Sequence, residues 1–269
     1  MDNKLTRRAL SLGLPLTLGL SHLIADAVAA DNATTQEVGA PARIRIGMLV
    51  YDDMILLDLT APMTVLVPAA SDIHLVAKSR KPVRTDIGVL VQPTMTFDEC
   101  PDDLDVLFVP GGLAGSLAAM NDEATTAFVA DRGSRAKWVT SVCTGSLVLG
   151  AAGLLRGYRA TSHWYVRDLL PLMGAEMSKD RVVTDRNRIT GGGATAGIDF
   201  GLTLVAQLRG EEYAKRIQLI LEYDPKPPFS AGSPDTAGPQ LVQEVLARRA
   251  RILAEARIAV ASAGERLLK

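Results

Sequence analysis

The sequence of 269 residues contains only two cysteines, Cys100 and Cys143. A disulfide framework and a zinc site of four thiolates are therefore excluded. Aromatic residues make up 4% of the chain, too few for a platform on which single-stranded nucleic acid could stack. The net charge of −1 excludes a polybasic nucleic-acid binder. Apolar residues, in contrast, make up 48% of the chain, which is enough for one globular core.

The sequence also lacks the common signatures of metal and nucleotide sites. Beyond residue 30 only two histidines remain, His74 and His163, and no further ligands stand at a recognisable spacing around them. No GxxxxGK[ST] phosphate loop and no dinucleotide fingerprint occurs, and the glycine-rich segment 191–197 matches neither. We therefore expect no metal site.

The first thirty residues have the pattern of an export signal. A basic start that ends in Arg7 and Arg8 precedes an apolar run over 9–20, and a small-residue A-x-A exit follows. The run is too short for a comfortable membrane span, and the arginine pair resembles a twin-arginine signal. We expect residues 1–30 to be removed on export to the periplasm, leaving residues 31–42 as a polar tether and no stable membrane span. An uncleaved anchor is the alternative.

From residue 43 onward, short apolar runs alternate with helical patterns. Strands are predicted at 43–53, 73–79, 105–112 and 137–143, and a hairpin at 181–193. Strands that are each followed by a helix imply βαβ units. The sequence therefore predicts an α/β fold with a doubly wound, mostly parallel sheet and helices on both faces.

Local signals place the starts of three helices. Asp58 or Thr60 is a candidate cap for the helix after the first strand, with Pro62 in its first turn. Asn121 is the predicted cap of the helix before the strand at 137–143. Thr195 is the predicted cap of the helix that follows the hairpin.

The C-terminal part departs from this alternation. The segment 222–239 contains five prolines and two glycines, which indicates an ordered arm or a linker. We expect the catalytic domain to cover 43–235 and a C-terminal helix to cover 236–269. An apolar stripe indicates that this helix packs across the domain or a partner subunit rather than forming a solvated tail; it comprises Leu241, Val245, Leu246, Ile252 and Leu253.

Cys143 stands where a predicted strand ends and a helix begins at once. A nucleophile at such an elbow is presented at the carboxyl edge of the sheet. The first helical N–H groups and the helix dipole would there favour the thiolate over the thiol. A buried, inert cysteine is the alternative, and the spacing by itself leaves both interpretations open.

Two other loops reach the same edge of a doubly wound sheet. Gly111 and Gly112 close a strand with amides that can approach a ligand, although a plain turn explains them equally well. Asp58 places a carboxyl near the cysteine as a candidate acid or base, or as a helix cap. His163 is a further candidate for the site, or else a helix-start residue. His74 lies within a predicted strand and is interpreted as a packed side chain.

Six segments occur in an order typical of one family: LLDLTAP (56–62), FVPGG (108–112), SVCTGSLVLGAAGLLRG (141–157), RATSHW (159–164), RITGGGATAGIDFGL (188–202) and EYDPKPPFSAGSP (222–234). They resemble the ThiJ/PfpI superfamily, whose members share a flavodoxin-like, class I glutamine amidotransferase-like fold and a nucleophile-elbow cysteine. Within it the chain is similar to the isonitrile (isocyanide) hydratase branch. Protease-like members carry a histidine after the cysteine and a glutamate on the first loop. Thr144 and Asp58 stand in those places here.

The resemblance implies a hydro-lyase that converts isonitriles, R–N≡C, to N-substituted formamides. It makes Cys143 the nucleophile and Asp58 its acid and base. Thr144 would contribute a backbone N–H and, as a further candidate, its hydroxyl. Three more residues would line the substrate: Gly111, Gly112 and His163. The resemblance implies no cofactor, a small-molecule substrate as the only other partner, and a homodimer.

Three alternatives from other classes remain. The chain could be another thiol enzyme of the superfamily, such as a glyoxalase or an amidase. It could be a redox or stress sensor in which Cys143 is oxidised. The sensor half of AraC-type regulators is also similar, but only some thirty residues follow Pro239, too few for a pair of helix-turn-helix units.

Overall fold

The structure is a computed structural model that describes residues 42–268. The predicted signal peptide and nearly all of the predicted tether lie outside the described residues. No helix of residues 42–268 has the length and apolar character needed to cross a bilayer.

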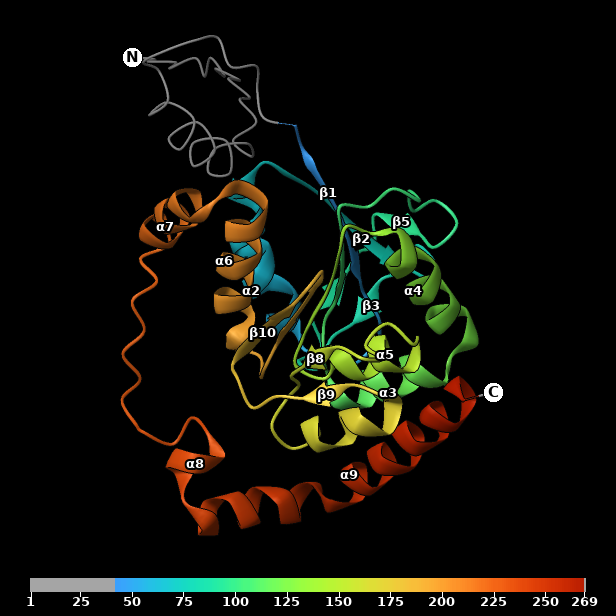
Figure 1. Cartoon of the computed structure of the whole chain (residues 1–269), viewed down its shortest axis with the longest axis vertical. Coiled ribbons are helices and arrows are strands. Elements are labelled where there is room, and N and C mark those ends of the chain that lie inside the picture. The colour runs from blue at the N-terminus through green and yellow to red at the C-terminus, as the bar shows by residue number, and fades with distance from the viewer. Residues whose placement is uncertain (1–41, 269) are drawn as a thin grey trace, which may run out of the picture.

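One sheet organises the described part of the chain (Figure 1). Its strands lie in the order β10 (Val182–Asp185), β11 (Arg188–Gly191), β7 (Trp138–Val142), β6 (Val106–Val109), β1 (Ile44–Leu49), β2 (Ser71–Ala77) and β5 (Met95–Thr96). Every neighbouring pair is parallel except the β10–β11 hairpin. All residues of β6 are buried, as expected for a central parallel strand covered on both faces. The predicted doubly wound α/β fold is confirmed.

Two short pairs of strands lie outside this sheet. β3 (Val83–Arg84) pairs with β4 (Leu90–Val91) in an antiparallel hairpin. β8 (Arg159–Ala160) pairs with β9 (Glu176–Met177) in parallel. Both pairs belong to loops that connect the larger elements.

Helices cover both faces of the sheet. One apolar cluster joins the sheet to α2 (Leu56–Leu66), α6 (Ala196–Arg209) and α7 (Glu211–Ile220), and the 3-10 turn η1 (Val67–Ala69) follows α2. A second cluster joins the other face to α3 (Leu113–Asn121), α4 (Glu123–Arg135), α5 (Gly145–Ala151), η2 (Arg167–Met173) and α9 (Pro239–Leu267). The sheet edge where β1, β6 and β7 end thus lies between two packed layers.

The structure corrects two of the predicted helix starts and confirms the position of the third. Asp58 lies in the first turn of α2, not at its cap, and Pro62 lies inside the helix rather than in its first turn. Asn121 ends α3, which the sequence analysis missed, and Asp122 caps α4 by accepting a hydrogen bond from a backbone amide. Thr195 stands at the cap of α6 but makes no capping bond through its side chain.

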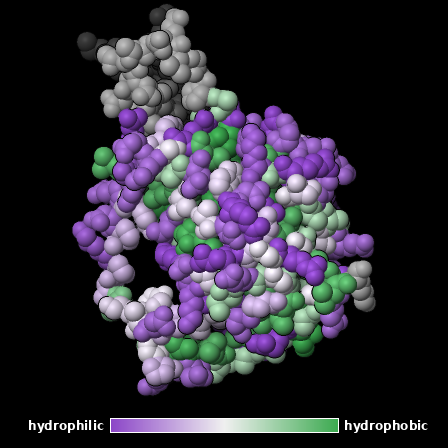
Figure 2. Space-filling view, in the orientation of Figure 1, coloured by the Kyte–Doolittle hydropathy of each residue, from purple (hydrophilic) through white to green (hydrophobic). Residues whose placement is uncertain are grey.

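The C-terminal arm leaves the domain before α9 returns to it. The segment from Tyr223 to the short helix α8 (Pro234–Ala237) runs outside the body, and Figure 2 shows an opening between the two. In the second half of α9, Ala256, Val260 and Ala263 are fully buried against the domain. In the first half, Leu241 is 43% exposed. The prediction that this helix packs across the domain is therefore correct for its second half.

Candidate functional site

Cys143 forms a strained elbow between the end of β7 and the start of α5. Its φ of +54° is in the left-handed region, which non-glycine residues occupy only when the surroundings enforce it. Its N–H donates to the carbonyls of Gly191 and Gly192, at 3.0 and 2.6 Å. Its own carbonyl accepts from the hydroxyls of Ser162 and Ser146, at 3.0 and 3.3 Å. These four bonds hold the cysteine in the conformation predicted for a nucleophile.

The predicted site residues converge on Gly111, in the loop after β6. Its N–H donates to Oδ2 of Asp58 at 2.9 Å. A Cβ atom at this position would lie 2.6 Å from that oxygen, 2.6 Å from the backbone nitrogen of Thr144 and 2.7 Å from Cβ of Cys143. Only a glycine permits this approach. Gly112, at φ +124°, makes the turn that leads into α3.

Burial controls the charge state of the reactive pair. Asp58 is fully buried, which raises the pKa of its carboxyl to about 7, although hydrogen bonds with Cys143 and Gly111 oppose the shift. Its Oδ1 has no hydrogen-bond partner among the described residues. Burial and the Asp58 carboxylate likewise raise the pKa of the Cys143 thiol well above its ordinary value.

The expected thiolate is therefore corrected. The elbow geometry is present, but α5 has only seven residues, and its amino-terminal dipole does not outweigh the desolvation of a sulfur that is fully buried. At neutral pH the resting nucleophile is a thiol beside a carboxyl that is close to half protonated. Such a pair can both donate and accept a proton.

A chain of buried hydroxyls fixes the loop around the cysteine. The N–H of Gly112 donates to Oγ1 of Thr144 at 2.9 Å, and that hydroxyl contacts Oγ of Ser116 at 2.8 Å. Ser116 in turn contacts the hydroxyl of Tyr51 at 3.2 Å, and Tyr51 donates to the carbonyl of Pro110. Because Tyr51 donates its proton to a carbonyl, it can only accept a hydrogen bond from Ser116. Ser116 must then accept from Thr144, so the hydroxyls donate in one direction, from Thr144 to Ser116 to Tyr51.

This direction limits what Thr144 offers to the reaction. Its hydroxyl proton faces Ser116 in the resting site, although a thiolate at Cys143 would be within its reach. Its backbone N–H faces the reactive pair beside Gly111. Of the two groups predicted for Thr144, the structure thus leaves the N–H free for the site.

His163, the remaining predicted site residue, lies against Tyr165 and is not among the atoms that meet around Gly111. Its ring centroid is 3.7 Å from that of Tyr165, and it packs against Gly193. Burial, with the charges of Arg249 and Arg167, lowers the pKa of His163 to about 4, so the ring is neutral. Its buried Nδ1 has no partner among residues 42–268.

Tyr51, Ser116 and Tyr165 were missed by the sequence analysis. Burial, together with the charges of Cys143 and Asp58, raises the pKa of Tyr165 to about 12. Tyr51 lies two residues after the end of β1, and the carboxyl end of that strand was the available signal. No comparable signal distinguishes Ser116 within α3.

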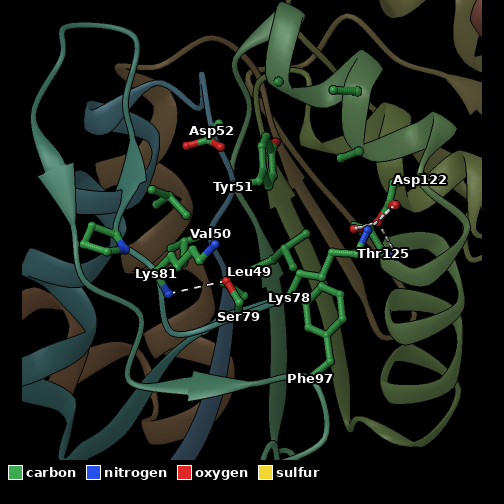
Figure 3. Close-up of a pocket in the computed structure, with 16 residues that line it drawn as sticks. Leu49, Val50, Tyr51, Asp52, Lys78, Ser79, Lys81, Phe97, Asp122 and Thr125 are labelled. Atoms are coloured by element: carbon green, nitrogen blue, oxygen red, sulfur yellow. Dashed lines mark hydrogen bonds and ion pairs between the residues drawn. The ribbon is translucent and has the colours of Figure 1, made fainter.

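A cavity of about 410 Å³ has Tyr51 in its wall and lies between the ends of β1 and β2 and the helices α3 and α4. Figure 3 shows Tyr51 at its wall and Lys78 extended toward Asp122, with which it forms an ion pair. Cys143 is not among the residues that line this cavity. Within the described range, no group of three or more histidine, cysteine or acidic side chains could hold a metal ion.

Known proteins share this architecture. An isonitrile hydratase of Pseudomonas putida is 52% identical over 208 residues, which is 77% of this chain and 90% of that protein. The crystal structure of a THiJ/PfpI family protein from Pseudomonas syringae superposes with a TM-score of 0.79 at 48% identity, covering 85% of this chain and 98% of that one. An HTH-type transcriptional regulator of Pseudomonas aeruginosa is 28% identical over 71% of this chain, but the match spans only 55% of the regulator.

The sequence profile of the DJ-1/PfpI family matches residues 44–207. This range begins with β1 and ends within α6, so it contains the whole set of residues around Gly111. The chain therefore belongs to the DJ-1/PfpI family.

Proposed function

We propose that this protein hydrates isonitriles to N-substituted formamides, with Cys143 as the nucleophile and Asp58 as the acid and base. The observation that carries the proposal is the buried thiol and carboxyl that meet at Gly111. The 52% identity to an isonitrile hydratase over most of both chains supports the choice of substrate. Protease-like members of the superfamily have glutamate and histidine at the positions of Asp58 and Thr144, and this difference argues against a peptidase.

The first step adds the thiol across the terminal carbon of the isonitrile. The Asp58 carboxylic acid protonates this carbon, and the sulfur of Cys143 bonds to it while the thiol proton passes to the Asp58 carboxylate. The product is a thioimidate, R–N=CH–S–Cys143, and the carboxyl is again protonated. A pKa of about 7 suits a group that must give and take one proton in the same step. The partnerless Oδ1 leaves one carboxyl oxygen available for the transfer.

Water completes the reaction. The Asp58 carboxylic acid gives its proton to the thioimidate nitrogen. Its other oxygen accepts a proton from the attacking water, so the carboxyl is protonated again. The tetrahedral adduct R–NH–CH(OH)–S–Cys143 then collapses: the carbon–sulfur bond breaks, the hydroxyl proton returns to sulfur through Asp58, and R–NH–CHO leaves. The backbone N–H of Thr144 supports the sulfur whenever it carries negative charge.

The charge state of Cys143 argues against the sensor alternative. Oxidation to sulfenic acid requires an accessible thiolate. Here the sulfur is fully buried, and burial raises the pKa of the thiol. A site that activates its thiol only together with a proton donor fits an addition reaction better than oxidation of the cysteine.

The test is a substrate panel on the purified mature protein and its Cys143→Ala variant. We expect formamide release from cyclohexyl isocyanide by the wild type and none by the variant, with equal melting temperatures. Consumption of methylglyoxal without turnover of any isonitrile would instead establish another thiol enzyme of the family.

We also propose export to the periplasm and a homodimer. The basic, apolar and small-residue pattern of residues 1–30 supports export. The outlying arm supports a dimer, because Phe229 is 79% exposed there and needs an apolar partner. Cell fractionation with N-terminal sequencing tests the first proposal, and light scattering of the mature protein tests the second.

A further inference from the structure

The acid of the proposed reaction lies at the positive end of a helix. Asp58 stands in the first turn of α2, where backbone N–H groups without helical partners concentrate positive potential. An acidic side chain in such a turn is ordinarily favoured as the carboxylate, which lowers its pKa. Burial instead raises the pKa of Asp58 to about 7. A second carboxyl group, from outside the helix, acts in the same direction as burial.

This second carboxyl group belongs to Asp86 and occupies the start of α2. Ile55, the residue before the helix, makes no hydrogen bond through its side chain. Oδ1 of Asp86, in the turn between β3 and β4, accepts from the N–H of Leu56 at 2.9 Å. Asp86 therefore takes the place of a local capping residue, although it lies 30 positions away in the sequence.

The hairpin that carries Asp86 is fixed to the segment before α2. The N–H of Asp53 donates to the carbonyl of Arg84 at 2.8 Å, and the N–H of Asp86 donates to the carbonyl of Met54 at 2.9 Å. The N–H of Arg84 donates to Oδ1 of Asp52 at 2.7 Å. Because these bonds hold the backbone on both sides, the Asp86 carboxylate has a set position relative to the first turn of α2.

The two carboxyl groups divide the work of this turn. Oδ2 of Asp58 accepts from the N–H of Gly111 at 2.9 Å, so it faces the site, while Asp86 satisfies the helix start. Burial is the largest cause of the raised pKa of Asp58, hydrogen bonds with Cys143 and Gly111 oppose it, and the charge of Asp86 adds to it. A negative charge at the start of α2 also weakens the potential that would favour the Asp58 carboxylate.

The other titratable groups that face Asp58 are uncharged at neutral pH. Burial raises the pKa of each of them: Cys143 at the elbow, Tyr51 after β1 and Tyr165 after β8. α2 has no other charged residue. α6 packs against α2 and has Asp199 in its first turn, where it pairs with Arg181 at 2.8 Å. The charge on Asp86 is thus the one to which protonation of Asp58 responds.

We propose that Asp86 is a positioning residue: its carboxylate holds the start of α2, so that Asp58 faces Gly111 as a proton donor rather than serving as a helix cap. This inference rests on the proposed function and adds a residue that acts through Asp58. Its two effects can be separated by substitution. Asparagine keeps a side-chain oxygen that accepts from Leu56 and removes the charge, whereas alanine removes both.

The first test is the pH profile of kcat/KM for cyclohexyl isocyanide in the mature protein. In Asp86→Asn we expect the fall at high pH to begin about half a unit lower, which reduces kcat/KM about three-fold at about pH 8 and leaves it unchanged at about pH 5. Asp86→Ala should also lose kcat at about pH 5, because the first turn of α2 is no longer held.

Asp122→Asn is the matched control. Asp122 caps α4 by accepting from the N–H of Thr125 at 3.0 Å, and none of the predicted site residues lies in that helix. Its pH profile should coincide with that of the wild type. A wild-type profile in Asp86→Asn, or an equal shift in Asp122→Asn, would overturn the inference.

Direct titration of Asp58 distinguishes failure of this inference from failure of the proposed function. Carbon NMR of protein with isotope-labelled aspartate carboxyl groups follows the Asp58 signal, which is identified by its absence in Asp58→Asn. We expect the pKa of Asp58 to fall by about half a unit in Asp86→Asn and to keep its wild-type value in Asp122→Asn. If no isonitrile is hydrated, the proposed function fails and this titration still decides the role of Asp86. Equal pKa values in all three proteins would refute it.

Discussion

A single added methyl group at Gly111 probes the geometry on which the proposed chemistry depends. The Cβ of Gly111→Ala would lie 2.6 Å from Oδ2 of Asp58 and 2.6 Å from the nitrogen of Thr144. Ordinary contact begins near 3.4 Å, so these atoms must separate by about 0.8 Å. Neither neighbour is the end of a flexible side chain: one is backbone and the other is a buried carboxylate that Gly111 itself holds.

The cost is divided between stability and activity. Overpacking of a buried site costs about 1–3 kcal/mol of unfolding free energy. A displacement of about 1 Å between reacting groups costs about 100-fold in rate. We therefore expect Gly111→Ala to remain folded, with a lower melting temperature and kcat/KM for cyclohexyl isocyanide reduced about 100-fold.

Gly232→Ala is the matched control, because nothing lies within 4 Å of a Cβ at that position. It should match the wild type in both measurements. A Gly111→Ala protein with wild-type kcat/KM would refute the assignment of the reactive centre to the Asp58, Thr144 and Cys143 triangle.

Three further predictions concern protons. Because the carboxyl of Asp58 must be protonated to start the reaction and has a pKa of about 7, kcat/KM should fall ten-fold per pH unit above about pH 7; a profile flat to pH 9 would contradict this. The raised pKa makes ionisation of Asp58 unfavourable to folding, so its contribution to stability is lost as pH rises from about 4 to about 7. Asp58→Asn should therefore lose less unfolding free energy than the wild type between pH 5 and 8 in urea titrations, by up to about 3 kcal/mol. Tyr51→Phe frees the Ser116 hydroxyl to donate to Thr144, so the Thr144 proton can then face the sulfur of Cys143. The pKa of Cys143, measured from the pH dependence of alkylation, should therefore fall by about one unit. An unchanged or higher pKa would contradict the direction assigned to the hydroxyl chain.

The sheet and its layers could be predicted from the sequence because their signals are local and repetitive. The runs that contain β1, β6 and β7 are continuous apolar segments, and each is followed by a helical pattern. The caps were harder to predict because partners distant in sequence decide them. The amide of Leu56, for example, is satisfied by Asp86, thirty residues away, so α2 needs no local cap.

The candidate site also has one part that could be predicted from the sequence and one that could not. Cys143, Asp58 and Gly111 follow strands, and parallel strands bring their carboxyl ends to one edge, so their meeting could be predicted. The charge state of Cys143 could not, because the desolvation that raises the pKa of its thiol depends on how the surrounding elements pack. The role of Ser116 became visible only when the structure showed which hydroxyls its side chain contacts.

The most direct test of the central claim is the mass of the protein during turnover. Mature wild-type protein mixed with cyclohexyl isocyanide and quenched in acid should carry an adduct of one isonitrile, located on the peptide that contains Cys143. The Cys143→Ala variant should form neither the adduct nor the formamide. Formamide release by that variant at the wild-type rate would contradict the account.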